Sequence, residues 1–152
     1  MPRRFPLQSL LELAQEHTDA AAKTLCALKA EWNAAEEKLQ QLLQYQQEYR
    51  QRLQHASQQG LNIATLREFQ HFIAKIDAAI ALQTLEVERC KKRWDMGREA
   101  WQQKKNKQGA FDALAKRHEV REVRRETKVE QQEQDEFASD SFRRKPFRED
   151  GD

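Results

Sequence analysis

The side chains that most often carry catalysis or bind metals are few in this chain and lie far apart. The histidines are His17, His55, His71 and His118, and the cysteines are Cys26 and Cys90. No histidine has a second histidine or a pair of cysteines four residues away, the helical spacing that brings metal ligands onto one face. No glycine-rich phosphate-binding loop is present in the sequence either. We therefore expect no metal, no cofactor and no catalytic residue, and two free thiols.

The composition indicates long helices rather than a compact globule. The chain has 152 residues, of which 34% are charged and 38% apolar, with only 4 glycines and 3 prolines. Helix-forming residues dominate, and no glycine or proline interrupts the chain between Leu7 and Ala56. So few apolar residues can form only a narrow core, which predicts a seam between helices.

A first apolar seam follows the heptad spacing of a coiled coil, with steps of four and three residues. Its positions are Leu7, Leu11, Ala14, Thr18, Ala21, Leu25, Leu28, Trp32, Ala35, Leu39, Leu42, Gln46, Tyr49, Leu53 and Ala56. The polar stretch 57–64, which contains Gly60, then predicts a turn. Asn62 or Thr65 could cap the next helix. Thr65 and Glu68, three residues later, match the capping-box pattern.

A second seam with the same spacing follows the turn. Its positions are Leu66, Phe69, Ile73, Ile76, Ile80, Gln83, Val87, Cys90, Trp94, Gly97, Trp101, Lys104, Gln108, Phe111 and Ala115. In an antiparallel hairpin, facing residues have a constant sum of positions. Pairing Ala56 with Leu66 gives 122, and every pair of seam positions outward from the turn has the same sum. Large residues thereby face small ones, with Trp32 opposite Cys90 and Leu25 opposite Gly97.

The predicted fold is therefore all-α, a long antiparallel two-helix coiled-coil hairpin. We expect a first helix over about 6–56, a turn over 57–64 and a second helix over about 65–136. The second helix should extend past the first, and a disordered tail should occupy 137–152. A two-helix hairpin has no water-excluding pocket, which disfavours catalysis. Neither a signal peptide nor a long apolar run is evident, so we expect a cytoplasmic protein.

Charge is distributed unevenly along the chain. Residues 91–128 carry 13 Lys and Arg against 6 Asp and Glu. The stretch could be an ordinary solvated helix face, a nucleic-acid-binding surface or a helix that enters an acidic socket of a protein partner. Interleaved acids and the lack of alternating aromatic residues disfavour nucleic acid. Near the turn, Tyr45 and Phe72 flank the seam, so they are better candidates for a binding patch than the seam residues Tyr49 and Phe69.

Five segments of the chain have a recognisable sequence. They are residues 42–50 (LLQYQQEYR), the turn with Gly60, residues 69–73 (FQHFI), residues 101–105 (WQQKK) and residues 135–138 (DEFA). Together they resemble the flagellar FliJ protein family. The resemblance covers nearly the whole chain and agrees with the hairpin spacing. It implies a non-enzymatic component of the flagellar type III protein export apparatus, similar to the central stalk of rotary ATPases.

The resemblance also implies partners and a location. Family members enter the ring of the export ATPase and promote its assembly and activity, bind the cytoplasmic domain of the membrane export gate, and escort export chaperones. It implies a protein of the cytoplasm that associates peripherally with the membrane at the flagellar base, with neither a nucleic acid nor a small-molecule substrate as partner. The alternative functions are a general coiled-coil adaptor or scaffold and a basic nucleic-acid-binding protein.

The family's gate-binding surface maps onto eight positions near the turn. These are Lys38, Leu42, Tyr45, Tyr49, Phe72, Ile76, Ala79 and Gln83. Lys38, Ile76 and Gln83 depart from the family pattern, in which a Gln, a Leu and a His stand there. For docking on the export ATPase, the candidates are the arginines of the basic stretch at the open end of the hairpin. They are Arg117, Arg121, Arg124 and Arg125.

Overall fold

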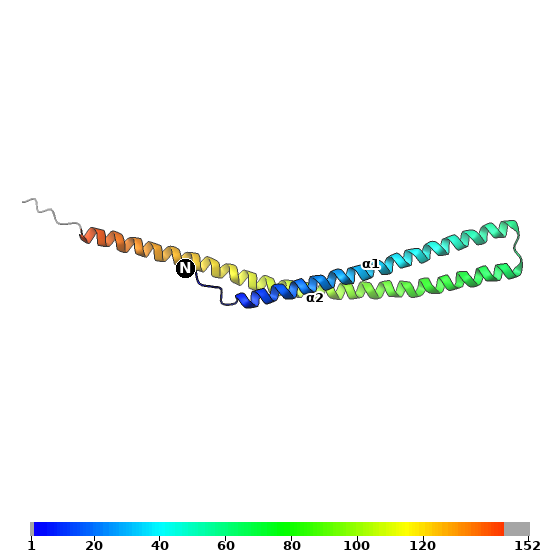
Figure 1. Ribbon diagram of the computed structural model, residues 1–152, viewed down its shortest axis with the longest axis horizontal. Helices are drawn as coiled ribbons and strands as arrows, with labels where there is room; N and C mark the ends of the chain where they lie inside the picture. The colour runs from blue at the N-terminus through cyan, green and yellow to red at the C-terminus, as the bar shows by residue number, and fades with distance from the viewer. Residues whose placement is uncertain (1, 145–152) are drawn as a thin grey trace, which may run out of the picture. The chain divides into compact units, whose positions relative to one another are not determined.

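Two long helices make up nearly all of the computed structural model, which describes residues 2–144. Helix α1 runs over Gln8–Gln59 and helix α2 over Ile63–Arg144, joined by a short turn (Figure 1). No strand occurs among the described residues. The predicted all-α pair of packed helices is therefore confirmed.

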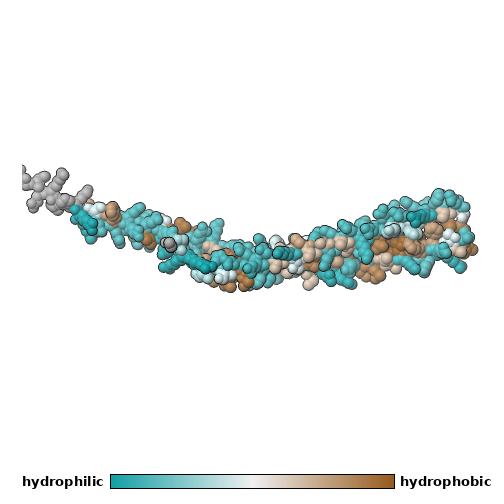
Figure 2. All heavy atoms as spheres, viewed as in Figure 1, coloured by the Kyte–Doolittle hydropathy of each residue, from teal (hydrophilic) through white to brown (hydrophobic). Residues whose placement is uncertain are grey.

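The contacts divide the chain into two compact units. Unit 2 is His17–Lys105 and contains the turn, whereas unit 1 consists of Met1–Glu16 together with Asn106–Asp152. In each unit a segment of α1 packs against a segment of α2, so each has its own part of the seam. Within unit 2, apolar residues gather between the two helices near the turn and polar residues cover their outer surfaces (Figure 2).

Burial follows both predicted seams closely. All fifteen positions of the first seam are buried or half-buried, and so are fourteen of the fifteen in the second. The exception is Lys104, which is exposed, because an ammonium group without a partner is costly to remove from water. Core residues remain partly accessible, with none fully buried and the lowest exposures near 5% at Ala14 and Cys90. The narrow seam therefore gives a thin core along the helices.

Contacts between the helices agree with the predicted register. An ideal Cβ on Gly97 would lie 3.7 Å from Leu25 Cδ1, as the sum of 122 requires. The side chains of Gln46 and Asp77 form a hydrogen bond, and Arg93 forms an ion pair with Glu31. Their position sums, 123 and 124, stay within two residues of the expected value.

One predicted pairing differs in detail. Trp32 was predicted to face Cys90, but its indole packs against Trp94, with ring centroids 5.4 Å apart. The Lys29 ammonium lies 3.8 Å from the Trp32 ring centroid. Because an indole extends well beyond its Cβ, it reaches the residue one helical turn along α2 and forms a tilted aromatic pair that a register argument based on Cα positions does not predict.

The turn shows why α1 stops and α2 starts. Gly60 has a φ of +91°, a left-handed conformation that glycine adopts without steric cost, directly after the last residue of α1. Asn62 Oδ1 accepts a hydrogen bond of 2.8 Å from the Thr65 backbone N–H, which makes Asn62 the N-cap. Of the two caps that the sequence offered, the structure uses Asn62. Helix α2 consequently begins at Ile63, two residues before the predicted start.

The other helix ends also differ from the predicted bounds. Helix α1 begins at Gln8 rather than near residue 6 and extends to Gln59 rather than 56. Helix α2 continues to Arg144, so residues 137–144 are helical where the sequence analysis predicted a disordered tail. No glycine or proline stands between Gly109 and Pro146, and the charges of Arg143 and Arg144 in the last turn interact favourably with the helix dipole. The rest of the predicted tail, 145–152, lies outside the described residues.

Two glycines inside α2 provide a test of how closely the helices approach. An alanine Cβ at Gly97 would lie 2.6 Å from Leu28 Cδ1, whereas one at Gly109 would have no atom within 4 Å. Gly109→Ala should therefore raise the free energy of unfolding by about 0.5–1 kcal/mol through helix propensity. At Gly97 the same gain is offset by overpacking of about 1–3 kcal/mol. Denaturant titrations of both variants should show Gly97→Ala to be the less stable, and equal stabilisation would contradict the close approach.

Candidate protein-binding surfaces

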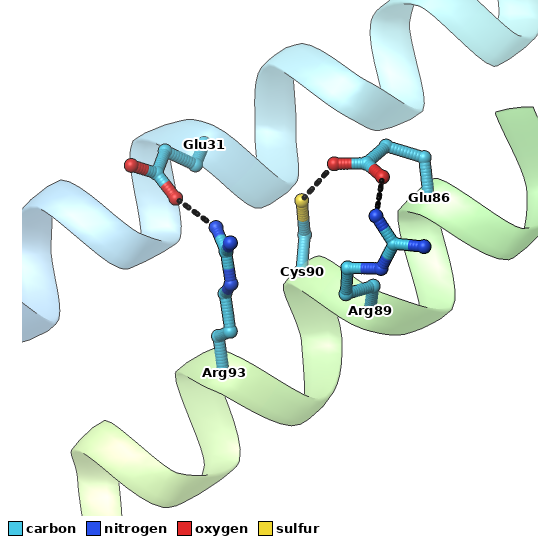
Figure 3. A network of polar contacts seen from close by, with 5 residues as sticks. All are labelled: Glu31, Glu86, Arg89, Cys90 and Arg93. Atoms are coloured by element: carbon cyan, nitrogen blue, oxygen red, sulfur yellow. Dashed lines mark hydrogen bonds and ion pairs between the residues drawn. The ribbon is translucent and has the colours of Figure 1, made fainter.

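Of the two cysteines, Cys26 is exposed, and Cys90 has the geometry of a structural residue rather than a reactive one. Cys26 and Cys90 are both free thiols, as predicted, and Cys90 is buried between the helices. Its Sγ donates to Glu86 Oε1 at 3.7 Å, while Arg89 contacts the other oxygen of that carboxylate (Figure 3). Burial, and then the charge and hydrogen bond of Glu86, raise the pKa of the Cys90 thiol. A protonated, enclosed thiol is a poor nucleophile.

Metal-binding clusters and membrane-spanning helices are both absent from residues 2–144. Within 2–144, no group of three or more His, Cys, Asp or Glu side chains could hold a metal ion. Within the same residues, no helix is both long and apolar enough to cross a membrane. The features that remain are surfaces on the helices, and two of them contain residues that the sequence analysis selected.

The first surface lies near the turn, in unit 2. We define the aromatic patch as Tyr45 and Tyr49 on α1 with Phe72 on α2. The rings of Tyr49 and Phe72 pack across the two helices with centroids 4.2 Å apart, and the Arg52 guanidinium lies 5.1 Å from the Tyr49 ring. Tyr45 is 56% exposed and Phe72 42% exposed. The patch therefore combines a ring pair that the fold holds in place with aromatic surface that a partner could cover.

The eight predicted gate-binding positions are not equally accessible. Lys38, Tyr45 and Phe72 are exposed, and Leu42, Tyr49 and Ala79 are half-buried. Ile76 and Gln83 are each only 8% exposed.

Gln83 illustrates what the buried positions do. Its Nε2 donates to the Ala35 carbonyl oxygen at 2.9 Å, so the side chain links the two helices. A partner at this surface could touch the aromatic patch directly, whereas Ile76 and Gln83 are buried in the seam.

The second surface lies on α2 in unit 1. A shallow cationic groove runs along one face of the helix, and three of the four predicted arginines line it. Its residues are Ala113, Lys116, Arg117, Val120, Arg121 and Arg124. The acids of this segment occupy other positions around the helix, at residues 119, 122 and 126. The groove is therefore cationic, and Val120, which is 44% exposed, adds apolar surface between the cations. Such a face would complement an acidic protein surface.

The fourth predicted arginine, Arg125, has a different position. Its Nε and a terminal nitrogen donate to Glu122 Oε2 at 3.2 and 2.9 Å. Glu122 is only 9% exposed, so the pair lies largely outside the groove. Of the four predicted arginines, Arg117, Arg121 and Arg124 line the groove, whereas the Arg125 side chain is 40% exposed and paired with Glu122.

An N-terminal arm, residues 2–7, explains why Glu122 is buried. The Arg3 backbone N–H donates to Glu122 Oε2 at 3.1 Å, and His118 Nε2 donates to the Arg3 carbonyl oxygen at 2.9 Å. The Phe5 ring packs on the His118 ring, with centroids 5.5 Å apart. The sequence analysis did not foresee this contact, which joins residues more than 110 positions apart, because backbone atoms of the arm leave no motif in the sequence.

The charge of Glu122 should govern docking of the arm. The Arg3 backbone hydrogen bond, and next the Arg125 side chain, hold the pKa of Glu122 below its ordinary value of 4.5. A lowered carboxyl pKa contributes stability that is present above 4.5 and is lost as the pH falls through the lowered pKa. Acidification should therefore release the arm.

Amide NMR of the Arg3 N–H provides the measurement. Its chemical shift should titrate with a midpoint below that of an ordinary glutamate, and Glu122→Ala should abolish the titration while Glu119→Ala leaves it. An Arg3 shift that does not respond to pH in the wild type, or that responds equally in both variants, would contradict the docked arm.

Comparison with known proteins identifies the family. The family model described as "Flagellar FliJ protein" matches residues 3–147. The flagellar FliJ protein of Salmonella typhi is 31% identical over 148 residues, covering 96% of this chain and 99% of that protein. The flagellar FliJ protein of Escherichia coli K12 is 29% identical over 146 residues, with the same coverages. The matched residues 3–147 include both surfaces described above. The chain therefore belongs to the flagellar FliJ protein family.

Proposed function

We propose that this chain is a non-enzymatic component of the flagellar type III protein export apparatus. In this proposal it binds the export ATPase ring and promotes its assembly and activity, binds the cytoplasmic domain of the membrane export gate, and escorts export chaperones. It would act in the cytoplasm, next to the membrane at the flagellar base. The observation that carries the proposal is the family match over 3–147, which includes two chemically different surfaces.

The aromatic patch suits the gate. Exposed aromatic rings next to a rigid ring pair supply apolar contact area with little loss of side-chain freedom, as is typical of binding hot spots. The cationic groove suits the ATPase, because opposite charges on two surfaces guide encounter and fix orientation. Separate surfaces in unit 2 and unit 1 would allow the two partners to be bound by different parts of the chain.

A charge-reversal variant tests the ATPase part of the proposal. Arg117→Glu/Arg121→Glu/Arg124→Glu should weaken stimulation of the purified export ATPase, and the difference from wild type should shrink as salt is raised. The matched control is Arg50→Glu/Arg52→Glu, which reverses charge near the turn. Equal stimulation by the wild type and the groove variant at low salt would count against charge-guided docking.

A gel shift separates the proposed function from nucleic-acid binding. If the groove bound DNA or RNA, the wild type would retard either nucleic acid at moderate salt, and the groove variant would do so less. We expect no retardation by either. The whole proposal is tested by complementation of a strain that lacks the gene, in which wild-type chain should restore motility and filament export.

A further inference from the structure

The outer face of α2 in unit 2 carries an apolar surface that neither the hairpin nor the two proposed binding surfaces explain. We define the outer stripe as Ala74, Ala78, Ala81, Leu82 and Leu85. Ala74, Ala78, Ala81 and Leu85 follow one another at steps of four, three and four residues, and Leu82 lies beside Ala81, which places all five side chains on one face of the helix. All are exposed, and Leu82 and Leu85 are 70% and 57% exposed. The seam residues Ile76 and Gln83 point the other way, toward α1.

The outer stripe resembles the contact face that one helix of a coiled coil presents to its partner helix. The heptad-like spacing matches the seam of an antiparallel coiled coil, and the three alanines would let a second helix approach closely on the turn side of the two leucines. Phe72 and Ala79 lie about a quarter to a third of a turn away around α2, so the outer stripe is separate from the aromatic patch.

The charges around the outer stripe indicate what could cover it. Basic residues continue the same face at both ends, with Arg67 and Lys75 toward the turn and Arg89 and Lys92 beyond Leu85, all exposed. The exposed Glu88 lies at one edge of this face. Glu86 forms an ion pair with Arg89, so the cations left for a partner are Arg67, Lys75 and Lys92. A partner helix whose apolar stripe is flanked by acidic residues would complement both the leucines and the cations.

A second copy of this chain would fit poorly. Because cations lie at both ends of the outer stripe, two copies paired in either direction would bring cations against cations. An acidic amphipathic helix of another protein has no such conflict.

We propose that the outer stripe is a docking surface for an acidic, amphipathic helix of an export chaperone. This inference rests on the proposed escort of chaperones and assigns it to named residues. Leu82 and Leu85 would insert into the apolar stripe of the chaperone helix, and Arg67 and Lys92 would pair with its acids. The chaperone would thus bind beside the aromatic patch, on the same unit but on a different face.

The test uses the full chain and purified export chaperones of the same bacterium. In Leu82→Gln/Leu85→Gln the dissociation constant for the chaperone should rise at least about tenfold, since central apolar contacts carry most of the binding energy. The matched control is Leu10→Gln/Leu13→Gln, which removes two leucines at the same spacing that are 46% and 45% exposed in unit 1. It should bind the chaperone as the wild type does. Gate binding and ATPase stimulation should be unchanged in the outer-stripe variant.

Charge reversal provides an independent readout. Arg67→Glu/Lys92→Glu should weaken chaperone binding at low salt, and the defect should narrow as salt rises. Equal chaperone affinity of wild type and Leu82→Gln/Leu85→Gln would overturn the assignment of the surface and leave the proposed escort intact. Absence of chaperone binding by the wild type would overturn both. A dimer of the chain that Leu82→Gln/Leu85→Gln dissociates would show that the outer stripe pairs two copies, and would also overturn the inference.

Discussion

Replacement of Ile76 by alanine is expected to lower the free energy of unfolding by about 2–5 kcal/mol. Ile76 is 8% exposed and lies in the seam between α1 and α2. The substitution removes buried methyl and methylene groups and leaves a cavity that two long helices can close only by moving toward each other. Because the core of unit 2 is one layer of side chains wide, few neighbours are available to fill that space.

Ile63 provides the matched control for this loss. It is the same residue type at the start of α2 but is 70% exposed, so Ile63→Ala should change the unfolding free energy by less than about 0.5 kcal/mol. Denaturant titrations followed by circular dichroism would measure both. Similar midpoints for the two variants would show that the seam contributes little to stability, contrary to the burial pattern.

Loss of the Phe72 ring should chiefly affect binding to the export gate. Phe72→Ala is expected to cost about 2 kcal/mol or more in affinity for the gate's cytoplasmic domain, roughly a thirtyfold rise in dissociation constant. The ring is 42% exposed and packs on Tyr49 at 4.2 Å. Its removal therefore also loses an aromatic pair worth about 0.5–1.5 kcal/mol. The cost in stability should still be smaller than that of Ile76→Ala.

The control for Phe72 is Phe137→Ala, because Phe137 is 75% exposed in unit 1. That variant should bind the gate as the wild type does. Calorimetric titration with the gate's cytoplasmic domain and a thermal melt of each variant would separate binding from folding. If Phe72→Ala unfolds as readily as Ile76→Ala while its affinity is unchanged, Phe72 is a core residue and the gate binds elsewhere.

The structure changes what the aromatic residues near the turn can do. Sequence spacing suggested that Tyr45 and Phe72 form one strip, since both flank the seam. The structure instead pairs Phe72 with Tyr49, and Tyr45 lies in a shallow groove with Gln41, Gln44 and Glu48 of α1. Tyr49 was predicted both as a seam residue and, from the family resemblance, as a gate-binding position, and its ring packs against that of Phe72. A seam residue at the edge of a two-helix core can thus support a surface residue directly.

Most of the hairpin could be predicted from the sequence, because the relevant information is local and periodic. A heptad pattern identifies the inner face of each helix. In an antiparallel pair, the constant sum of the positions of facing residues, 122 in this chain, then sets the register between the two faces. Gly60 and Asn62 similarly end one helix and begin the next through their own backbone and side-chain chemistry. None of these features depends on a distant residue.

Only the tertiary structure determined how individual side chains share these faces. Trp32 reaches Trp94 because its ring is longer than the spacing between seam layers. Glu122 is buried, and Arg125 is turned toward it and away from the groove, because the N-terminal arm covers that part of α2. The arm is held by backbone atoms of Arg3, which have the same chemistry in every sequence, so no pattern of residue types could predict where it docks.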